Sequence, residues 1–558
     1  MLGTTMPMRT PFAPLLRPIT APLEAIGRVG ETAVVVGRTG ILGPYPPHRL
    51  LAAGAVLRRN GVGLGGVFAL AAALRGDHVV AVDDRGASTA TDMERRAAQV
   101  AAALAAAGVR AGDQVAVMCR NSRHFLATIV ALGKIGADIL YLNTGFAAPQ
   151  LREVSAREGA KAMVLDEEFL PVAEGVDLPL FVAWRDGGGR RADGVVSLDD
   201  VVCGPPLEPP AHAGRESRQI ILTSGTTGTP KGAQRETSSQ VAPIVALLSR
   251  IPLRTGDVTV VAAPMFHSWG LANAAIGLAF GSRLVLPRRF DPEDTLRLVA
   301  EQRASVLVVV PVMLQRIMDL PEKVRRRYDT SSLRVIGLSG SALPGELAVR
   351  AMDAFGDVVY NLYGSTEVGW VSIADPADLR GAPGTAGRVP LGTSVRLLDD
   401  DDAPVAPGRP GRIFVRSGLL FEGYTGGGGK AVVDGYMSTG DMGHFDEAGR
   451  LFVDGRDDDM IVSGGENVFP REVEDLLAEH PSVADVAVVG VPDEEFGQRL
   501  AAFVVAADGA EIDPDELRGH VRAALARYKV PRDITVVDEL PRNATGKVLR
   551  RELRDNPA

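Results

Sequence analysis

The sequence predicts an α/β fold with a large N-terminal domain and a small α+β C-terminal domain. From His78 onward, apolar runs of strand length alternate with helix-like runs, a pattern typical of mixed, mainly parallel sheets with flanking helices. Shorter strand-like runs at residues 395–398 and 411–416 indicate a β-rich sub-domain. A group of helix- and strand-like runs after Arg456 spans about 100 residues, the size of a separate domain.

These observations divide the chain into three segments: an N-terminal extension of unclear role (1–76), the large domain (77–455) and the small domain (456–558). In the large domain, Thr91 and Glu94 have the spacing of a capping box and are expected to open an Ala-rich helix. The expected strands of the large domain are residues 79–83, 114–119, 138–142, 219–223, 258–262, 283–286, 306–310 and 333–338. In the small domain we expect helices at 470–479 and 514–526 and strands at 483–491, 500–506 and 534–538.

The N-terminal extension is the least informative segment. Prolines at positions 7, 11, 14, 18 and 22 indicate a loop, and a helix-like run follows at residues 48–58. Gly61, Gly63 and Gly66 match the G-x-G-x-x-G dinucleotide pattern, but the residues before Gly61 look helical, so the match is weak. We interpret the extension as an arm packed on the main domain. Contact with a membrane surface or a lipid-like substrate is the alternative.

Composition excludes several classes of protein. Apolar residues make up 46% and charged residues 23% of the 558 residues, which excludes general disorder. The net charge of −9 argues against nucleic-acid binding, which needs a basic surface. Two cysteines are too few for a disulfide scaffold, and no apolar run reaches the roughly 18–20 residues of a membrane span. We therefore expect a cytoplasmic protein without a transmembrane segment; peripheral membrane contact and a homodimer are left open.

The segment with the most specific chemistry is a Gly- and Thr-rich loop after an apolar strand. Its glycines let backbone N–H groups approach a polyphosphate, its hydroxyls add donors, and one lysine adds a point charge. It is not a Walker A loop, because Pro230 precedes Lys231. The chain has seven lysines against 53 arginines, which makes a lysine here more informative. The segment reads Thr223-Ser224-Gly225-Thr226-Thr227-Gly228-Thr229-Pro230-Lys231-Gly232.

This loop resembles the phosphate-binding signature of the adenylate-forming superfamily, which includes acyl-CoA synthetases, luciferases and peptide-synthetase adenylation domains. Further signatures of that superfamily follow in order, and the resemblance spans about residues 78 to 552. They are Y-G-x-T-E at 363–367, T-G-D at 439–441, the hinge motif at 455–458, the segment 463–467 and P-R-x-x-x-G-K at 541–547. The resemblance implies ATP, Mg²⁺ and coenzyme A as cofactors and a small-molecule carboxylic acid as substrate.

The resemblance also implies how the phosphates of ATP are held. Thr366 would donate to the α-phosphate, and Glu367 would hold Mg²⁺, which prefers hard oxygen ligands. The β- and γ-phosphates would lie against Thr223, Ser224, Gly225, Thr226, Thr227, Gly228 and Lys231.

The nucleoside would be held by four other residues. Tyr363 would stack on the adenine, and Ser341 would close the adenine end of the pocket. Asp441 would accept hydrogen bonds from both ribose hydroxyls, and Arg456 would reach the ribose or the phosphate. The alternatives are that Tyr363 packs in the core and that Asp441 and Arg456 form an ordinary ion pair.

Lys547 is the sharpest prediction. In the family it enters from the small domain and bridges the substrate carboxylate and the α-phosphate; the alternative is a tail lysine in a charged run. Asp458 aligns with the hinge about which the small domain swings for the second half-reaction. Ser463, Gly464 and Gly465 would then line the CoA path, since glycine allows close backbone approach.

The acyl pocket is expected around residues 264–270. Amino-acid-activating relatives have an Asp here, whereas this chain has His267, which we count among the catalytic residues. Trp269, Gly270 and Gly340 would line the pocket, although the same residues could be plain core. The apolar run at residues 271–280 leaves room for an apolar chain, so we expect a hydrophobic acid, with a fatty acid as the first choice.

The chain departs from the family at one segment. The usual G-Y-x-x-x-P-E becomes Gly423-Tyr424-Thr425 followed by four glycines at 426–429, where we expect a mobile loop and have no functional account.

The predicted function is ATP-dependent conversion of the acid, through acyl-AMP, to acyl-CoA, with release of pyrophosphate and AMP. An acyl-AMP ligase that loads a free-standing carrier protein is the main alternative. A catalytically silent binding protein is disfavoured, because the expected catalytic positions are filled. A luciferase-type oxygenase would share the motifs and is not excluded by them.

Overall fold

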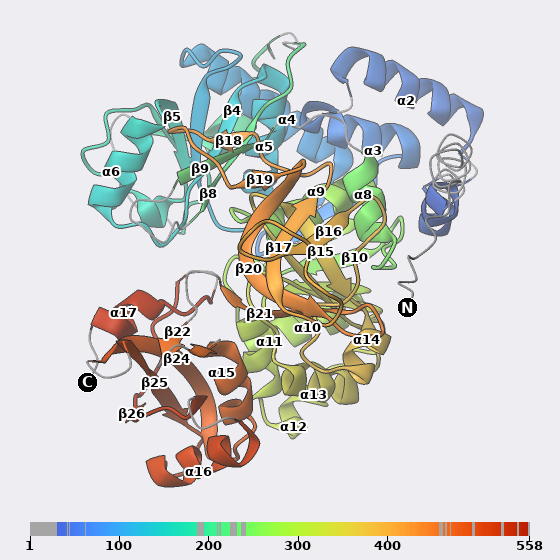
Figure 1. Ribbon diagram of the computed structural model, residues 1–558. Coiled ribbons are helices and arrows are strands. Elements are labelled where there is room, and N and C mark those ends of the chain that lie inside the picture. The colour runs from blue at the N-terminus through green and yellow to red at the C-terminus, as the bar shows by residue number, and fades with distance from the viewer. Residues whose placement is uncertain are drawn as a thin grey trace, which may run out of the picture.

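Two eight-stranded sheets frame the large domain of the computed structural model (Figure 1). The structure describes residues 31–41, 43, 45–61, 63–186, 195–208, 210, 214–223, 231–235, 241–456, 461–463, 466–468, 470–493, 497–525, 529–543 and 546–555. Within these residues the first sheet has the order β15-β14-β13-β12-β10-β11-β1-β2, and the second has the order β18-β9-β8-β4-β3-β5-β6-β7.

The first sheet is parallel except at its edges. Strands β1 (Val79–Asp83), β10 (Val258–Val261), β11 (Arg283–Val285), β12 (Val306–Val309), β13 (Val335–Leu338) and β14 (Val359–Ser365) run in parallel. Strands β2 (Gly86–Thr89) and β15 (Gly369–Ala374) close the edges in antiparallel fashion. The second sheet is also mainly parallel. Its parallel strands are β3 (Gln114–Met118), β4 (Asp138–Tyr141), β5 (Ala160–Leu165), β6 (Leu180–Val182), β7 (Val196–Ser197) and β8 (Gln219–Thr223). At one edge, β9 (Lys231–Arg235) and β18 (Gly423–Tyr424) pair in antiparallel fashion.

Two smaller sheets complete the molecule, as the sequence predicts. The β-rich sub-domain is an antiparallel sheet of β16 (Ser394–Leu398), β17 (Gly411–Arg416), β19 (Val432–Val433), β20 (Tyr436–Phe445) and β21 (Leu451–Arg456). The small domain holds β22 (Ile461–Ser463), β23 (Glu466–Val468), β24 (Val483–Asp493), β25 (Gly497–Ala506) and β26 (Asp533–Val536). Its helices are α15 (Pro470–Ala478), α16 (Pro514–Ala524) and α17 (Arg550–Asp555).

Helices cover the sheets of the large domain. They are α4 (Ala90–Ala106), α5 (Arg123–Ile135), α6 (Ala148–Arg157), α7 (Leu198–Cys203), α8 (Val241–Leu248), α9 (Ser268–Ala279), α10 (Pro292–Gln302), α11 (Pro311–Met318), α12 (Glu322–Arg325), α13 (Gly345–Phe355) and α14 (Pro376–Gly381). None of the helices in the described part of the chain is long and apolar enough to cross a membrane.

The capping box predicted at Thr91 and Glu94 is wrong by two residues. Helix α4 begins at Ala90, and its cap is Thr89, whose side chain accepts from the Asp92 backbone N–H while Asp92 reaches back to the Thr89 N–H. Both pairs have the same spacing, and the end of β2 at Thr89 decides between them.

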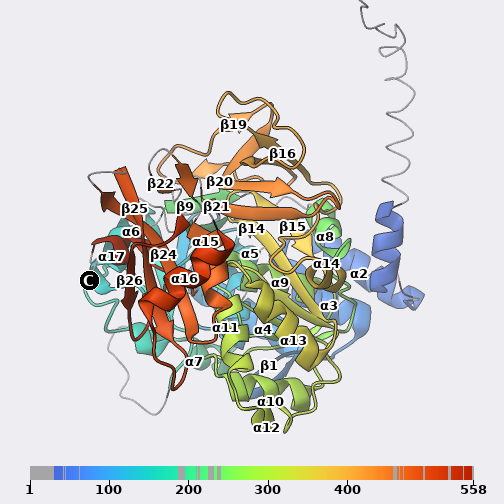
Figure 2. The same ribbon diagram turned by 60° about the horizontal axis from the view of Figure 1, so that its bottom comes forward.

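The G-x-G-x-x-G segment does not follow a strand and therefore is not a dinucleotide loop. It joins α2 (Pro47–Asn60) to α3 (Val67–Arg75) through a short 3₁₀ turn at Leu64–Gly66. A Cβ at Gly65 would lie 2.8 Å from the backbone of Gly133 in α5, and a Cβ at Gly66 would lie 2.7 Å from Asn60. These glycines allow the N-terminal helices to pack closely on α5. Figures 1 and 2 place α2 and α3 on the side of the large domain away from the small domain.

Helix α5 is the central element of the large domain, and all of its residues are buried. Its apolar side chains share one core cluster with residues of both eight-stranded sheets. The charged residues of α5 are paired: Arg123 with Asp83 of β1, and Lys134 with Glu94 of α4. Because a buried charge needs a partner, these pairs fix α5 between the two sheets.

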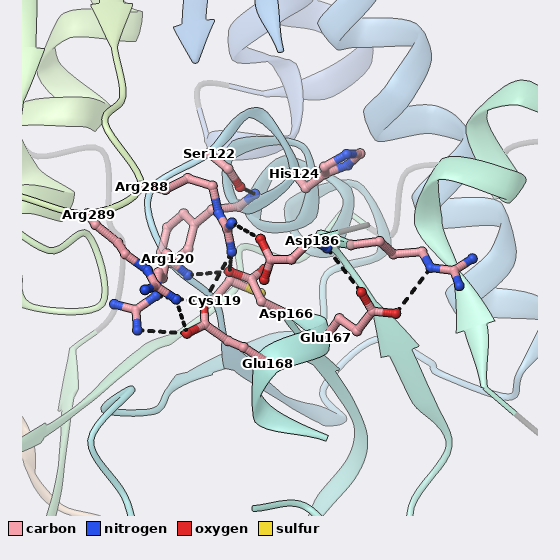
Figure 3. Close-up of polar contacts among 12 residues, drawn as sticks. Cys119, Arg120, Ser122, His124, Asp166, Glu167, Glu168, Asp186, Arg288 and Arg289 are labelled. Carbon is pink, nitrogen blue, oxygen red and sulfur yellow. Dashed lines mark hydrogen bonds and ion pairs between the residues drawn. The ribbon is translucent and has the colours of Figure 1, made fainter. Parts of the chain in front are cut away.

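A second polar contact joins the carboxyl ends of three strands (Figure 3). Arg288, which follows β11, contacts Asp166 and Glu168, which follow β5, at 3.2 Å each. Arg120, which follows β3, donates two hydrogen bonds to Glu168 at 2.7 and 2.8 Å. The network therefore links the two sheets at one edge.

Burial raises the pKa of Asp166 from its ordinary value of 3.8 to about 6, although Arg120 and Arg288 oppose the rise. The folded protein then takes up this proton at a higher pH than the unfolded chain does. The contribution of Asp166 to stability is therefore greatest below about pH 4 and is lost as the pH rises to about 6.

We expect the Asp166→Asn variant to lack this pH dependence. Between pH 4 and pH 6, the wild type should lose up to about 3 kcal/mol of unfolding free energy relative to the variant. Urea unfolding of both proteins across this range measures the difference. A difference that does not change with pH would contradict the assignment.

Candidate active site

A cavity of about 1870 Å³ lies where the first eight-stranded sheet, the β-rich sub-domain and the small domain meet. The loops after β13 and β14, the ends of β20 and β21, helix α15 and the segment around Lys547 all line it. It also continues along α9, where Leu271, Ala275 and Ala279 form part of the wall. Ligands of open parallel sheets commonly bind at the carboxyl ends of the strands, which is where this cavity opens.

One end of the cavity is organised around a buried carboxylate. The hydroxyl of Tyr363 on β14 donates to Asp441 of β20 at 2.5 Å, and Arg456 of β21 lies 3.7 Å from the other oxygen of Asp441. Burial raises the pKa of Asp441, while Tyr363 and Arg456 oppose the rise. Burial also keeps the pKa of Tyr363 well above its ordinary value, so its hydroxyl remains a donor. The result is an oriented hydrogen-bond acceptor facing the cavity.

A second carboxylate, Glu367, is buried beside it. The hydroxyl of Tyr424 donates to Glu367 Oε1 at 3.0 Å, and the Glu367 carbonyl accepts from Phe421 at 2.7 Å. Gly364 is required here, because a Cβ would lie 2.0 Å from the carbonyl oxygen of Gly369. The Y-G-x-T-E segment thus spans the end of β14 at Ser365 and the turn that follows it, which holds Thr366 and Glu367.

Within the described residues, no group of three or more His, Cys, Asp or Glu could form a metal cage. Glu367 is nevertheless a suitable ligand for Mg²⁺, which proteins commonly hold through one or two carboxylates and the phosphates of the substrate.

Lys231 lies near the same carboxylate. It begins β9 and pairs with Thr223 at the end of β8, so the two residues flank the glycine-rich loop. Its Nζ is 5.6 Å from the ring centroid of Tyr424. Residues Ser224, Gly225, Thr226, Thr227 and Gly228 lie outside the described residues.

The apolar end of the cavity is formed around α9. Trp269 is buried, donates from Nε1 to the Val309 carbonyl at 3.0 Å and packs on Gly337. A Cβ at Gly270 would lie 2.4 Å from the Pro264 carbonyl, and Gly340 has φ +98°. Both glycines line the cavity, but the backbone already requires them, and they do not by themselves indicate space for a ligand.

His267 lies between the two ends. Burial lowers the pKa of His267 to about 4, and its Nε2 has no hydrogen-bond partner among the described residues. A neutral imidazole whose buried Nε2 has no partner among the described residues therefore forms part of the cavity wall.

Lys547 reaches the cavity from the small domain. Its backbone N–H is fixed by Asn543 Oδ1 at 2.9 Å, and the preceding Gly546 has φ +79°. A Cβ at Gly546 would lie 2.4 Å from Val312 of α11, so the small domain touches the large domain here. The positive charge of Lys547 is close enough to oppose the raised pKa of Asp441.

Comparison with known proteins identifies the superfamily. Residues 68–425 match the AMP-binding enzyme family, and residues 472–547 match the AMP-binding enzyme C-terminal domain. The chain belongs to the AMP-binding enzyme family.

Three similar proteins cover most of this AMP-binding enzyme. A feruloyl-CoA synthase from an Amycolatopsis species is 35% identical over 488 residues, which are 86% of this chain and 96% of that protein. The fatty acid–[acyl-carrier-protein] ligase ScoC from Streptomyces coeruleorubidus is 31% identical over 488 residues, which are 84% and 91% of the two chains. The crystal structure of the anthranilate CoA ligase AuaEII with anthranoyl-AMP matches with a TM-score of 0.79 and 26% identity, over 88% and 96% of the two chains.

This AMP-binding enzyme is therefore an AMP-forming acid–thiol ligase, and its family uses ATP, Mg²⁺ and CoA. Most of the site residues predicted from the sequence line the one cavity: Lys231, His267, Trp269, Gly270, Gly340, Ser341, Tyr363, Thr366, Glu367, Asp441, Arg456 and Lys547. Thr223 ends β8 and Ser463 ends β22 in the sheet of the small domain, but their side chains lie outside what the structure describes. Asp458, Gly464 and Gly465 lie outside the described residues.

Three cavity residues were missed from the sequence. Asn361 lies two residues before Tyr363, is buried, and has no partner for its Oδ1 among the described residues. Tyr424 holds Glu367, and Lys430 lies beside the T-G-D segment. The position of Asn361 before the Y-G-x-T-E motif could have identified it. Tyr424 matches the tyrosine of the family segment G-Y-x-x-x-P-E, which could have identified it, whereas Lys430 follows the glycines that depart from that segment and carried no signal.

We expect His267 to remain neutral throughout the range in which the enzyme works. Its imidazole should show no protonation step between pH 5.5 and pH 8, because burial lowers its pKa to about 4. NMR titration of the imidazole signals tests this, with His267→Gln to assign the resonance. A transition near pH 6.5 would contradict the assignment.

Proposed function

We propose that this enzyme converts a hydrophobic carboxylic acid, through its acyl-adenylate, into a CoA thioester. The observation that carries the proposal is the single cavity, which joins the carboxylates of Glu367 and Asp441, the lysine of the small domain and the apolar wall of α9. An acid bound along α9 would present its carboxylate to a nucleotide held at Asp441. Such placement replaces a bimolecular encounter of two anions by an oriented contact.

The first half-reaction joins the acid to AMP. An oxygen of the substrate carboxylate attacks the α-phosphorus of ATP, and pyrophosphate leaves. Lys547 would neutralise the approaching carboxylate and the α-phosphate together, and Thr366 would donate to that phosphate. Lys231, with the loop at 224–228, would hold the β- and γ-phosphates. Mg²⁺ on Glu367 would supply positive charge to the phosphates.

The nucleoside would be fixed by the other groups at this end of the cavity. Asp441 would accept hydrogen bonds from the ribose hydroxyls, with Arg456 beside it, and Tyr363 and Ser341 would enclose the adenine. Asn361 has an unpartnered carbonyl oxygen that could accept from the adenine amino group.

The second half-reaction transfers the acyl group to sulfur. The thiol of CoA attacks the acyl carbonyl, the thiol proton is lost, and AMP leaves. We propose that the small domain turns about Asp458 for this step, so that Ser463, Gly464 and Gly465 line the path of CoA.

We propose a broader class of acid substrate than the fatty acids that the sequence led us to expect. Sequence reasoning favoured a fatty acid, whereas the feruloyl-CoA synthase and the anthranilate CoA ligase carry aromatic acids in their names. A wall built from Trp269 and small residues of α9 suits either an aromatic ring or an aliphatic chain. We therefore propose a hydrophobic acid without choosing between the two.

Loading of a carrier protein is the second candidate, and the similarity to ScoC favours it. Both candidates share the first half-reaction and differ only in the thiol that accepts the acyl group.

The location of the protein in the cell and its assembly into a homodimer remain predictions. Helix α2 exposes Leu50, Leu51 and Leu57 beside Arg58 and Arg59, which is compatible with peripheral contact with a membrane. The cytoplasmic location and the homodimer likewise rest on the sequence alone.

Pyrophosphate release from Mg-ATP, measured across fatty, aromatic and amino acids, tests the proposed function. We expect release that depends on one class of hydrophobic acid, and consumption of CoA to a thioester in the same samples. Acyl-AMP that accumulates while CoA is untouched would favour the carrier-protein ligase. Release that no acid stimulates would contradict both candidates.

A further inference from the structure

The lysines of this chain are concentrated at the cavity. The chain has only seven lysines, and Lys231, Lys430 and Lys547 all line the same cavity. Lys231 and Lys547 lie in motifs of the family, whereas Lys430 lies in the segment that departs from it. A lysine is a compact charge on a flexible stem and is not equivalent to the arginine that this chain otherwise prefers. Lys430 therefore needs a physical explanation.

Lys430 is directed at the T-G-D segment of β20. Its Nζ donates to the Thr439 carbonyl at 3.4 Å, and a Cβ built at Gly440 would lie 3.2 Å from the same Nζ. Arg456 also approaches Gly440, with Nη2 3.4 Å from the same Cβ position. The positive charge of Lys430 also opposes the rise that burial causes in the pKa of Asp441. Lys430 and Arg456 thus both lie next to Gly440, which precedes the residue that would hold the ribose.

The four glycines before Lys430 explain how it is presented. The Gly427 N–H donates to the Tyr424 carbonyl at 2.8 Å, and the Tyr424 N–H donates to the Gly428 carbonyl at 3.2 Å. Gly427 and Gly428 both have φ +85°, which residues with a side chain rarely adopt. After Lys430, the Ala431 carbonyl accepts from Ser438 of β20 at 2.8 Å. The segment is a closed turn tied to β20, and it directs one lysine into the cavity.

The chemistry of Lys430 restricts what it can recognise. An ammonium group donates and cannot accept, and it gains most from an anionic partner. Asp441 already serves as the acceptor for neutral ribose hydroxyls in the proposed function. The anionic group next to a ribose bound there is the 5′-phosphate, which becomes the α-phosphate in ATP and the phosphate of the acyl-adenylate.

We propose that Lys430 binds the α-phosphate of the nucleotide and remains on it through both half-reactions. The inference rests on the proposed function. Lys547 belongs to the small domain and leaves the nucleotide when that domain turns, whereas Lys430 belongs to the large domain. The segment in which this chain differs from the family would thus supply a phosphate contact. That contact does not depend on the position of the small domain.

Binding of AMP compared with adenosine tests this, because the two ligands differ only in the phosphate. In calorimetric titrations we expect Lys430→Met to weaken AMP binding about tenfold or more, as for loss of one charge-assisted hydrogen bond, and to leave adenosine binding unchanged. Lys430→Arg, which keeps the charge, should recover most of the loss. Lys323→Met is the matched control: this exposed lysine of α12 is not among the residues lining the cavity, and the variant should bind both ligands like the wild type.

The possible results distinguish failure of the inference about Lys430 from failure of the proposed function. Equal weakening of AMP and adenosine by Lys430→Met would mean that Lys430 only supports the Thr439 turn and would overturn the inference. Unchanged AMP binding would also overturn it and would leave the proposed function intact. A wild-type protein that binds neither ligand would instead contradict the proposed function itself.

Discussion

The hydrogen bond from the Tyr363 hydroxyl to the Asp441 carboxylate is the contact around which the site is arranged. It joins β14, in the first eight-stranded sheet, to β20, in the β-rich sub-domain. Arg456, at the end of β21, pairs with the same carboxylate, next to the boundary expected from the sequence for the small domain. A buried carboxylate is costly without such partners, so the geometry of the nucleotide end depends on all three residues together. One contact therefore fixes where two sheets and the start of the small domain meet.

The second constraint is the distribution of positive charge. The proposed reaction brings a carboxylate to a triphosphate, and an enzyme can make this contact favourable only with cations that are already in place. Here they come from separate elements: Lys231 from β9, Lys430 from the turn before β19, and Lys547 from the small domain. In the proposed mechanism the cation from the small domain would be withdrawn when that domain turns, while the other two would stay. Such a division of positive charge between the two domains suits an enzyme that first forms an adenylate and then releases AMP.

Much of this could be predicted from the sequence, because local patterns determined it. The runs expected as strands in the large domain coincide with β1, β3, β4, β8, β10, β11, β12 and β13. Six motif residues meet in one cavity: Tyr363, Thr366, Glu367, Asp441, Arg456 and Lys547. The helix cap at Thr89 was assigned two residues late, because two Thr–acid pairs have the same spacing and only the end of β2 separates them. The glycines at positions 61–66 looked like a nucleotide motif. Their actual partner, Gly133, is distant in the sequence, and no local pattern reveals such a contact.

The parts that could not be predicted depend on packing between distant residues. The acyl end of the cavity is shaped by Trp269 against Gly337 and by the small residues of α9, so its volume is not readable from either segment alone. Gly270 and Gly340 looked like space for a substrate, but the backbone around them already requires glycine. The role of Lys430 depends on a turn that follows no family pattern. In the proposed function these residues bear on substrate choice and on the placement of charge.

The most direct test of this account measures the two half-reactions separately in the Lys547→Ala variant. Formation of acyl-AMP from ATP and the acid should fall by at least about a hundredfold, as for loss of a group that stabilises transition-state charge. Formation of the thioester from supplied acyl-AMP and CoA should be retained, because Lys547 would have left the nucleotide by then. Equal loss of both half-reactions, or retention of both, would contradict the claim that the small domain delivers Lys547 for the first step alone.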